Sequence, residues 1–302
     1  MFARRQTTAG VSATLLLMTT LIIKRSKPKR KTSVNNELPF LTPLKKRALP
    51  APRRTGDGAV QPKATSNHLL ALLPRKDRLR ITALCDTVQF SLGQVLAEPG
   101  TLSSFVYFPI TSFISLIAQT DGKLGLEVGM AGREGMLGAQ LTVGVPIAPL
   151  HALVQGAGEA LRMRAAAFKR ELESCSAFRR IMGQYFYVQD AQLAASAACV
   201  RFHLVGPRLA RWLLMSQDRA GASTFHLTHE FLAYMLGVRR VGITTAAVAM
   251  QRSNLVRYHR GELTVLDRKG LERAACSCYD ANKQLYDSLL PGIERSLYRS
   301  GT

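Results

Sequence analysis

Apolar positions between residues 228 and 266 repeat first with the period of a helix and then with the alternation of a strand. Phe231, Leu232, Met235 and Leu236 recur at spacings of one, three and four, which predicts the apolar face of a short helix. Thr228 is a suitable N-cap for this helix, because its hydroxyl can accept a hydrogen bond from a free backbone N–H.

A tight turn and a second helix follow. Gly237 suits the left-handed conformation that ends a helix, and the next helix is expected to begin near Arg239 or Arg240. Its predicted apolar face consists of Val241, Ile243, Ala246, Ala247, Val248 and Met250. Two short alternating segments flank a turn at Arg260-Gly261. This order predicts a winged helix-turn-helix.

The middle of the chain has a different pattern. Residues 66–84 have helical spacing, and short β-like runs separated by glycine-rich turns extend from Val88 to Met163. The expected strands are Val88–Leu92, Phe105–Phe108, Phe113–Ile117, Leu124–Val128, Ala152–Gln155 and Glu159–Met163. Several short strands at this spacing predict a small barrel or sandwich.

Helical spacing returns over residues 165–219, with a heptad-like seam in its first half. The seam consists of Phe178, Ile181, Tyr185, Val188, Gln192, Ala195 and Cys199, and continues to Phe202. It fits either a dimerisation helix or a helix packed on its own β-domain. A second helix is expected from about Val205 to Gln217.

The charge of the C-terminal segment distinguishes it from an ordinary helical domain. The net charge of the chain is +21, and five arginines but no acidic residue lie between Gly237 and Arg260. Residues toward the start of the second helix are expected to reach base edges, and later arginines to contact phosphates. The candidate DNA contacts are Thr228, Arg239, Arg240, Thr244, Thr245, Arg252, Arg257 and Arg260. The competing interpretation is a basic surface helix that packs against another element.

The segment from Thr228 to Leu266 resembles the C-terminal domain of the Crp/Fnr superfamily of transcription regulators. Phe90–Gly100 and Phe105–Pro109 are similar to the opening of that family's β-roll, and the similarity covers about residues 66–290. The resemblance implies an α+β chain with an N-terminal double-stranded β-roll like a cyclic-nucleotide-binding domain, a long dimerisation helix and a C-terminal winged helix-turn-helix. The corresponding ranges are 66–170, 171–203 and 204–290, with a tail at 291–302.

The resemblance also implies a function. A member would be a cytoplasmic homodimer that binds double-stranded DNA, senses an unidentified effector, and contacts RNA polymerase if it is an activator. The alternative is a ligand-binding or membrane-proximal signalling module whose winged helix contacts protein. We find no nucleophile–base pair, phosphate loop or metal spacing in the sequence, and therefore expect no enzyme activity and no cofactor.

Two departures from the family limit these expectations. The family's recognition helix commonly carries Arg-Glu and a second Arg four residues later, whereas this chain has Arg240, Val241 and Thr245. In the β-roll, the positions of the Glu and Arg that hold a cyclic nucleotide fall on Ala139 or Met136 and on Pro149, Leu150 and His151. No Lys or Arg lies between Arg133 and Arg162, so we expect no response to cAMP. Arg133 and Glu134 could hold another ligand or simply pair on the surface.

The five cysteines lack the spacing of a disulfide framework, which favours reduced thiols. Cys276-Ser-Cys278 could bind a metal or form a redox pair, but no second pair of ligands lies nearby in the sequence, so no metal site is predicted. His151 is expected to be structural rather than a haem ligand, and His226 and His229 are not expected to converge on a metal.

Residues 1–65 form a separate region by composition. Residues 1–63 hold 14 basic and two acidic residues, and Val11–Ile23 is an apolar run too short for a membrane span of about 20 residues. Residues 24–65 are rich in Pro, Lys and Arg and are expected to be disordered. This extension is interpreted as dispensable or non-native, as a membrane-proximal anchor, or as a basic arm that assists DNA binding.

Overall fold

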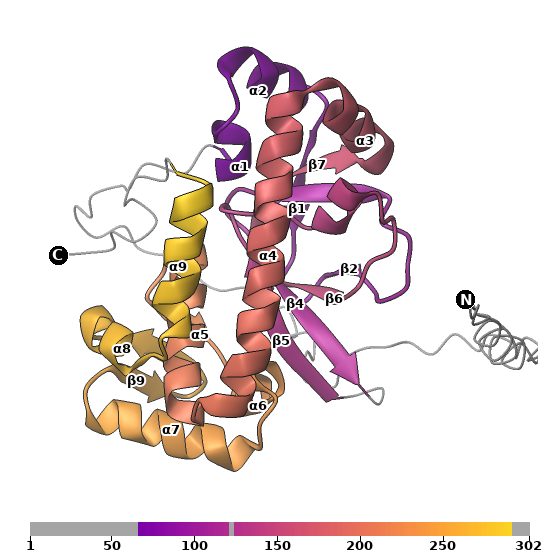
Figure 1. The fold of residues 1–302 in the computed structure, drawn as a ribbon. Helices are drawn as coiled ribbons and strands as arrows, with labels where there is room; N and C mark the ends of the chain where they lie inside the picture. Colours follow the sequence, from indigo (N-terminus) through magenta and orange to yellow (C-terminus); the bar gives the residue numbers. More distant parts are fainter. Residues whose placement is uncertain (1–65, 121–123, 292–302) are drawn as a thin grey trace, which may run out of the picture. The chain divides into compact units, whose positions relative to one another are not determined.

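The computed structural model describes residues 66–120 and 124–291, and its N-terminal half is built on two antiparallel sheets (Figure 1). One sheet has the order β1-β7-β3, formed by Asp86–Phe90, Gly158–Arg164 and Phe105–Pro109. The other has the order β2-β6-β4-β5, formed by Val95–Ala97, His151–Gly156, Phe113–Thr120 and Leu124–Ala131. Each of the six strands predicted from the sequence overlaps a strand of these sheets, although Val88–Leu92 extends two residues past the end of β1. Strand β2 was not predicted, because its three residues are all apolar and give no alternation of apolar and polar positions.

Short helices cover this β-roll. They are α1 (His68–Ala71), α2 (Arg75–Thr82), the 3-10 helix η1 (Ala139–Val143) and α3 (Ala165–Ser174). A core cluster of buried residues lies between these helices, the first sheet and the helix that follows. At its centre Phe168 packs edge-on against Phe178, with ring centroids 5.3 Å apart, and both side chains are fully buried.

Helix α4 (Ser176–Phe202) is the long helix predicted from the heptad pattern, and it lies beside α9 (Cys278–Leu289) (Figure 1). The predicted seam is buried inside the protomer itself. Its fully or nearly buried members are Phe178, Ile181, Tyr185, Val188 and Cys199. The proposal that these five residues form the dimer interface is therefore wrong, because their apolar surface is already covered by the chain's own core. Gln192 and Ala195 are half-buried.

The C-terminal elements form the predicted winged helix-turn-helix. They are α5 (Val205–Ala220), β8 (Thr224–His226), α6 (His229–Leu236), α7 (Arg240–Arg252), β9 (Val256–His259), β10 (Glu262–Val265), α8 (Arg268–Ala274) and α9. The wing strands form a sheet of order β8-β10-β9, of which the sequence analysis predicted only the last two strands.

All described elements fall within a single compact unit. Helix α6 lies against β5 of the β-roll, where Tyr234 packs on Gly125 and its hydroxyl accepts a hydrogen bond from Gln119 at 3.3 Å. In residues 66–120 and 124–291, no single helix has the length and hydropathy of a membrane span, and α6 and α7 meet that test only as a pair bent by 110°. The predictions for the N-terminal extension and for the tail beyond Pro291 lie outside the described residues.

Candidate nucleic-acid interface and ligand pocket

The point at which α7 begins depends on how α6 begins and ends. The Thr228 hydroxyl caps α6 by accepting from the backbone N–H of Phe231 at 3.1 Å. Gly237 ends α6 with φ of 61°, a conformation that glycine adopts without the steric cost of a Cβ. The chain then turns by 110°, and α7 begins at Arg240 with Arg239 as its N-cap residue, as the sequence predicted.

Helix α7 has one buried face and one exposed face. Its buried residues are Ile243, Ala246, Ala247 and Met250, at offsets of three, four and seven. The prediction that Val241 and Val248 belong to this apolar face is wrong, because Val241 is 68% exposed and Val248 is 37% exposed. The exposed face carries the candidate contacts Arg239, Arg240, Thr244, Thr245 and Arg252.

Two side chains that the sequence analysis did not count among the DNA contacts, Glu230 and His229, lie next to residues on the exposed face of α7. Glu230 lies 4.0 Å from the guanidinium of Arg240, and both side chains are largely exposed. The imidazole of His229 lies 3.0 Å from the Thr244 hydroxyl and stacks on the ring of Tyr258 at 4.6 Å. Burial, and then the charge of Arg240, lowers the pKa of His229, which favours the neutral ring. Thr244 also donates to the carbonyl of Arg240 at 3.2 Å, so its exposed hydroxyl already has hydrogen-bond partners within the protein.

The wing is a tight hairpin. Arg260 and Gly261 connect β9 to β10 with φ of 48° and 84°, as a two-residue turn of type I′ requires. The Tyr258 hydroxyl donates to the carbonyl of Leu227 at 2.6 Å and so ties the wing to the start of α6. Arg257 and Arg260 are exposed on this hairpin. Arg252 ends α7, about 18 Å along the helix from Arg240.

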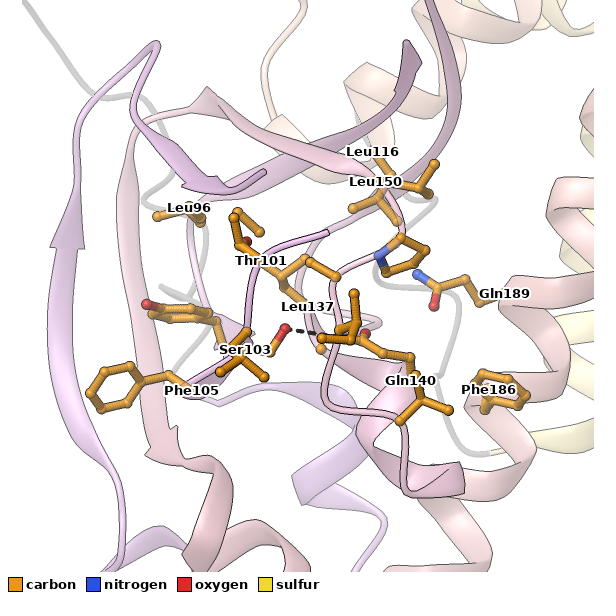
Figure 2. A pocket seen from close by; sticks show the side chains of 18 of the residues that line it. Leu96, Thr101, Ser103, Phe105, Leu116, Leu137, Gln140, Leu150, Phe186 and Gln189 are labelled. Atoms are coloured by element: carbon orange, nitrogen blue, oxygen red, sulfur yellow. Dashed lines mark hydrogen bonds between the residues drawn. The ribbon is translucent and has the colours of Figure 1, made fainter. Parts of the chain in front are cut away.

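A separate cavity of about 560 Å³ lies between the β-roll and α4 (Figure 2). Its walls are mostly apolar, with Leu96, Leu116, Leu137 and Leu150 on the roll side and Phe186 on α4. Polar groups are few, and one pair of them, Gln140 and Ser103, is joined by a hydrogen bond of 2.9 Å. Of the described residues that line the cavity, only Asp190 is charged.

Among the described residues that line the cavity, none is a cation that could pair with a cyclic phosphate. Met136 and Ala139, at the positions expected for the ribose-binding Glu, are buried. Pro149 and Leu150 line the cavity, and His151 is buried, with Nδ1 2.9 Å from the carboxylate of Glu98. A phosphate in this cavity would meet mostly apolar side chains, a few neutral polar groups and the carboxylate of Asp190, but no cation, which is unfavourable.

Arg133 and Glu134, for which the sequence left a ligand role and a surface pair open, do not line this cavity. The Glu134 carboxylate forms an ion pair with Arg219 of α5 at 2.8 Å, and both side chains are largely buried. It also accepts from the backbone N–H of Gly132, and the Glu134 carbonyl accepts from the hydroxyl of Tyr286. Glu134 thus connects the β-roll to α5 and α9 instead of forming a pair on the surface.

The structure also changes the interpretation of the cysteines. Cys199 and His203, at the end of α4, lie beside Cys276 and Cys278, and one ligand atom from each lies within 4.8 Å of the others. No second pair of ligands lies near Cys276 and Cys278 along the sequence, but the fold brings Cys199 and His203 next to them. Sequence spacing could not reveal it, because the two pairs are more than 70 residues apart.

Comparison with known proteins shows what one domain of the chain and its fold are similar to. Residues 207–274 match the model of the Crp-like helix-turn-helix domain. The chain is similar to FixK2 from Bradyrhizobium japonicum, with a TM-score of 0.55 and 11% identity, over 64% of this chain and 98% of that one. It is also similar to the c-di-GMP-responsive global regulator CLP from Xanthomonas campestris, with a TM-score of 0.54, 16% identity and coverage of 64% and 100%.

A Crp-family transcriptional regulator from Thermus thermophilus gives a TM-score of 0.53, 14% identity and coverage of 62% of this chain and 96% of that one. No curated protein sequence matches the chain. The predicted fold class is confirmed by these similarities.

Proposed function

Since the chain has the fold of Crp/Fnr transcription regulators and a Crp-like helix-turn-helix domain, we propose that it is a sequence-specific DNA-binding regulator of transcription that acts as a homodimer in the cytoplasm. The observation that carries this proposal is the exposed start of α7, where Arg239, Arg240, Val241 and Thr245 point away from the core. Helix-turn-helix proteins insert this end of the second helix into the major groove.

The side chains on this end suit base edges. Arg240 has a largely exposed guanidinium, which can donate to O6 and N7 of one guanine together. Val241 can contact a thymine methyl group, because it is exposed on the same turn. Arg252, Arg257 and Arg260 supply positive charge for phosphates at the far end of α7 and on the wing. In this proposal Thr228 and Thr244 serve mainly within the protein, as a helix cap and as a partner of His229.

A dimer would use the face of α4 that the protomer leaves open. Small or exposed side chains recur there at spacings of three and four, in the order Gly183, Tyr187, Asp190, Ala194, Ala197 and Arg201. Such a heptad row lets two helices approach closely around a two-fold axis. A dimer of this kind would place two copies of α7 in successive major grooves.

The apolar cavity between the β-roll and α4 is the proposed effector site. Its lining favours an uncharged, largely apolar molecule over a cyclic nucleotide, because Asp190 repels a phosphate and no described lining residue is cationic. Gln189 and Phe186 belong to α4, so an effector here would contact the same helix that carries the proposed dimer face. If the regulator is an activator, RNA polymerase is a further partner.

Selection from a pool of random DNA duplexes tests the proposal with the full-length chain. We expect enrichment of a two-fold symmetric sequence whose half-sites are one helical turn apart. The Arg240→Ala variant is the matched control, and its selected half-site should lose one specified base pair. If the wild type enriches no sequence, the chain is not a sequence-specific regulator, and the winged helix would then serve protein contacts.

A further inference from the structure

Two pairs of metal-binding side chains meet where α4 ends. Cys199 lies in the last turn of α4 and His203 is the C-cap of that helix, whereas Cys276 lies between α8 and α9 and Cys278 is the first residue of α9. The Cys199 and Cys276 sulfurs are 3.6 Å apart, and the Cys278 sulfur lies 3.6 Å from Nδ1 of His203. The four donor atoms all lie within 4.8 Å of one another.

We propose that Cys199, His203, Cys276 and Cys278 bind one Zn²⁺ ion in a tetrahedral site. Zinc–sulfur bonds of about 2.3 Å and zinc–nitrogen bonds of about 2.0 Å place two sulfurs about 3.8 Å apart and a sulfur and a nitrogen about 3.5 Å apart. The two 3.6 Å separations agree with these values. Three thiolates and one imidazole are a ligand set of structural zinc sites.

The surroundings supply positive charge for a zinc–thiolate centre. Arg211 of α5 lies close enough to Cys199, Cys276 and Cys278 to interact electrostatically with all three. Cys278 is the first residue of α9, where the helix dipole stabilises a negative charge. Three thiolates, a neutral imidazole and Zn²⁺ carry one net negative charge, which Arg211 would balance.

A disulfide between Cys199 and Cys276 is the competing explanation of the short sulfur separation. It would need an oxidant, and it would leave Cys278 and His203 without a role, although they lie next to the same two sulfurs. A metal accounts for all four side chains.

The site would hold together two regions that move separately if α4 and α5 hinge. His203 is the C-cap of α4, and α5 begins two residues later at Val205. Cys276 donates its backbone N–H to the carbonyl of Pro207 in α5, so the cysteine pair already packs at this junction. Zinc would therefore fix the winged helix relative to α4. This consequence for DNA binding rests on the proposed function, whereas the metal site does not.

Metal titration of the reduced full-length chain tests the site directly. After treatment with a chelator, Zn²⁺ alone is added in competition with a chromophoric chelator. We expect one tightly bound zinc per chain. Co²⁺ should give the thiolate charge-transfer and ligand-field bands of a tetrahedral cysteine site. His203→Gln and Cys278→Ser should each weaken zinc binding at least about tenfold, because one of four ligands is removed.

Cys85→Ser is the matched control. Cys85 lies in the β-roll, donates to the carbonyl of Ile81, and is not part of the cluster, so zinc affinity should not change. His203 and Cys278 are only half-buried, and circular dichroism of the metal-free variants checks that they fold.

The proposal is overturned if the wild type fails to bind one zinc per chain, or if its affinity is unchanged in both folded cluster variants. A Cys199–Cys276 disulfide in a chain that binds no zinc when reduced would also overturn it, in favour of a redox pair. DNA binding is measured separately, so zinc binding without DNA binding would reject the proposed function alone.

Discussion

At the residue scale, we propose that the arginines divide into base-reading and phosphate-binding positions, and substitution of Arg240 tests this division. It begins α7 with a largely exposed guanidinium, whereas Arg257 lies on the wing. We expect Arg240→Ala to weaken binding to the selected site by about 1–3 kcal/mol and to relax one base preference per half-site. Arg257→Ala should weaken binding to all sequences alike. Fluorescence anisotropy with selected and random duplexes measures both effects. If the ratio of the affinities for the two duplexes is the same in Arg240→Ala as in the wild type, Arg240 does not take part in base recognition.

The buried carboxyl of Glu127, on β5, should make the stability of the folded chain depend on pH. Burial raises the pKa of this carboxyl to about 7, against the opposing effects of the Ser115 hydroxyl and the charges of Arg219 and Arg211. The folded chain therefore keeps a proton that the unfolded chain loses above its usual pKa of 4.5. Stability should fall as pH rises from about 4.5 through 7, by at most on the order of 3 kcal/mol.

Glu127→Gln should remove that dependence, because the amide can still bond to Ser115 but does not ionise. Urea unfolding of both proteins at pH 5 and pH 8 is the measurement. If the free energy of unfolding changes by the same amount between pH 5 and pH 8 in the wild type and in Glu127→Gln, Glu127 does not cause the effect.

The sequence predicted where helices and turns begin and end better than it predicted which side chains contact one another. The turn at Gly237, the cap at Thr228 and the start of α7 followed from local chemistry, and the structure confirms them. Val241 and Val248 were assigned to the core because they are apolar, yet helix geometry places them on the opposite face from Ile243 and Met250. The proximity of Glu230 to Arg240, and of Cys199 to Cys276, depends on how helices pack, which spacing along the chain does not contain.

At the element scale, α4 shows why a heptad pattern has two interpretations. Phe178, Ile181 and Val188 repeat as a seam would, but the residues they contact belong to the same protomer. Apolar periodicity records that a face is buried and does not record by which chain.

The proposed dimer face of α4 can be tested by adding a charge to it. Ala194 is exposed in the protomer, so Ala194→Glu should leave the fold intact and separate the chains by placing two carboxylates at the two-fold axis. Sedimentation at micromolar concentration should show monomers for this variant and dimers for the wild type. Ala281→Glu, exposed on α9, makes the same change away from this face and should remain dimeric. A dimeric Ala194→Glu protein would place the interface elsewhere.

At the scale of the whole molecule, the β-roll fold does not by itself specify its ligand. The glycine-rich turns and short strands predicted a small barrel or sandwich, and the family resemblance implied the roll. The missing Glu and Arg predicted that cyclic nucleotides do not fit. The cavity, with Asp190 as its charged lining residue, supports that expectation. The apolar lining could not be predicted, because it combines residues from several strands with Phe186 of α4.

Isothermal titration calorimetry with cAMP therefore should give no saturable heat at micromolar concentrations, since no described lining residue can neutralise the phosphate. Saturable micromolar binding would contradict this account of the cavity.

The salt dependence of DNA binding tests the central claim, that α7 and the wing meet duplex DNA, most directly. The full-length chain and an Arg257→Ala/Arg260→Ala variant carry the same N-terminal charge and differ only on the wing. On a plot of log Kobs against log salt concentration, the wild type should show a steep negative slope. The slope of the variant should be shallower by about 0.9 for each phosphate that the wing no longer neutralises. Identical slopes and affinities for the two proteins, or no binding by the wild type at low salt, would contradict the account.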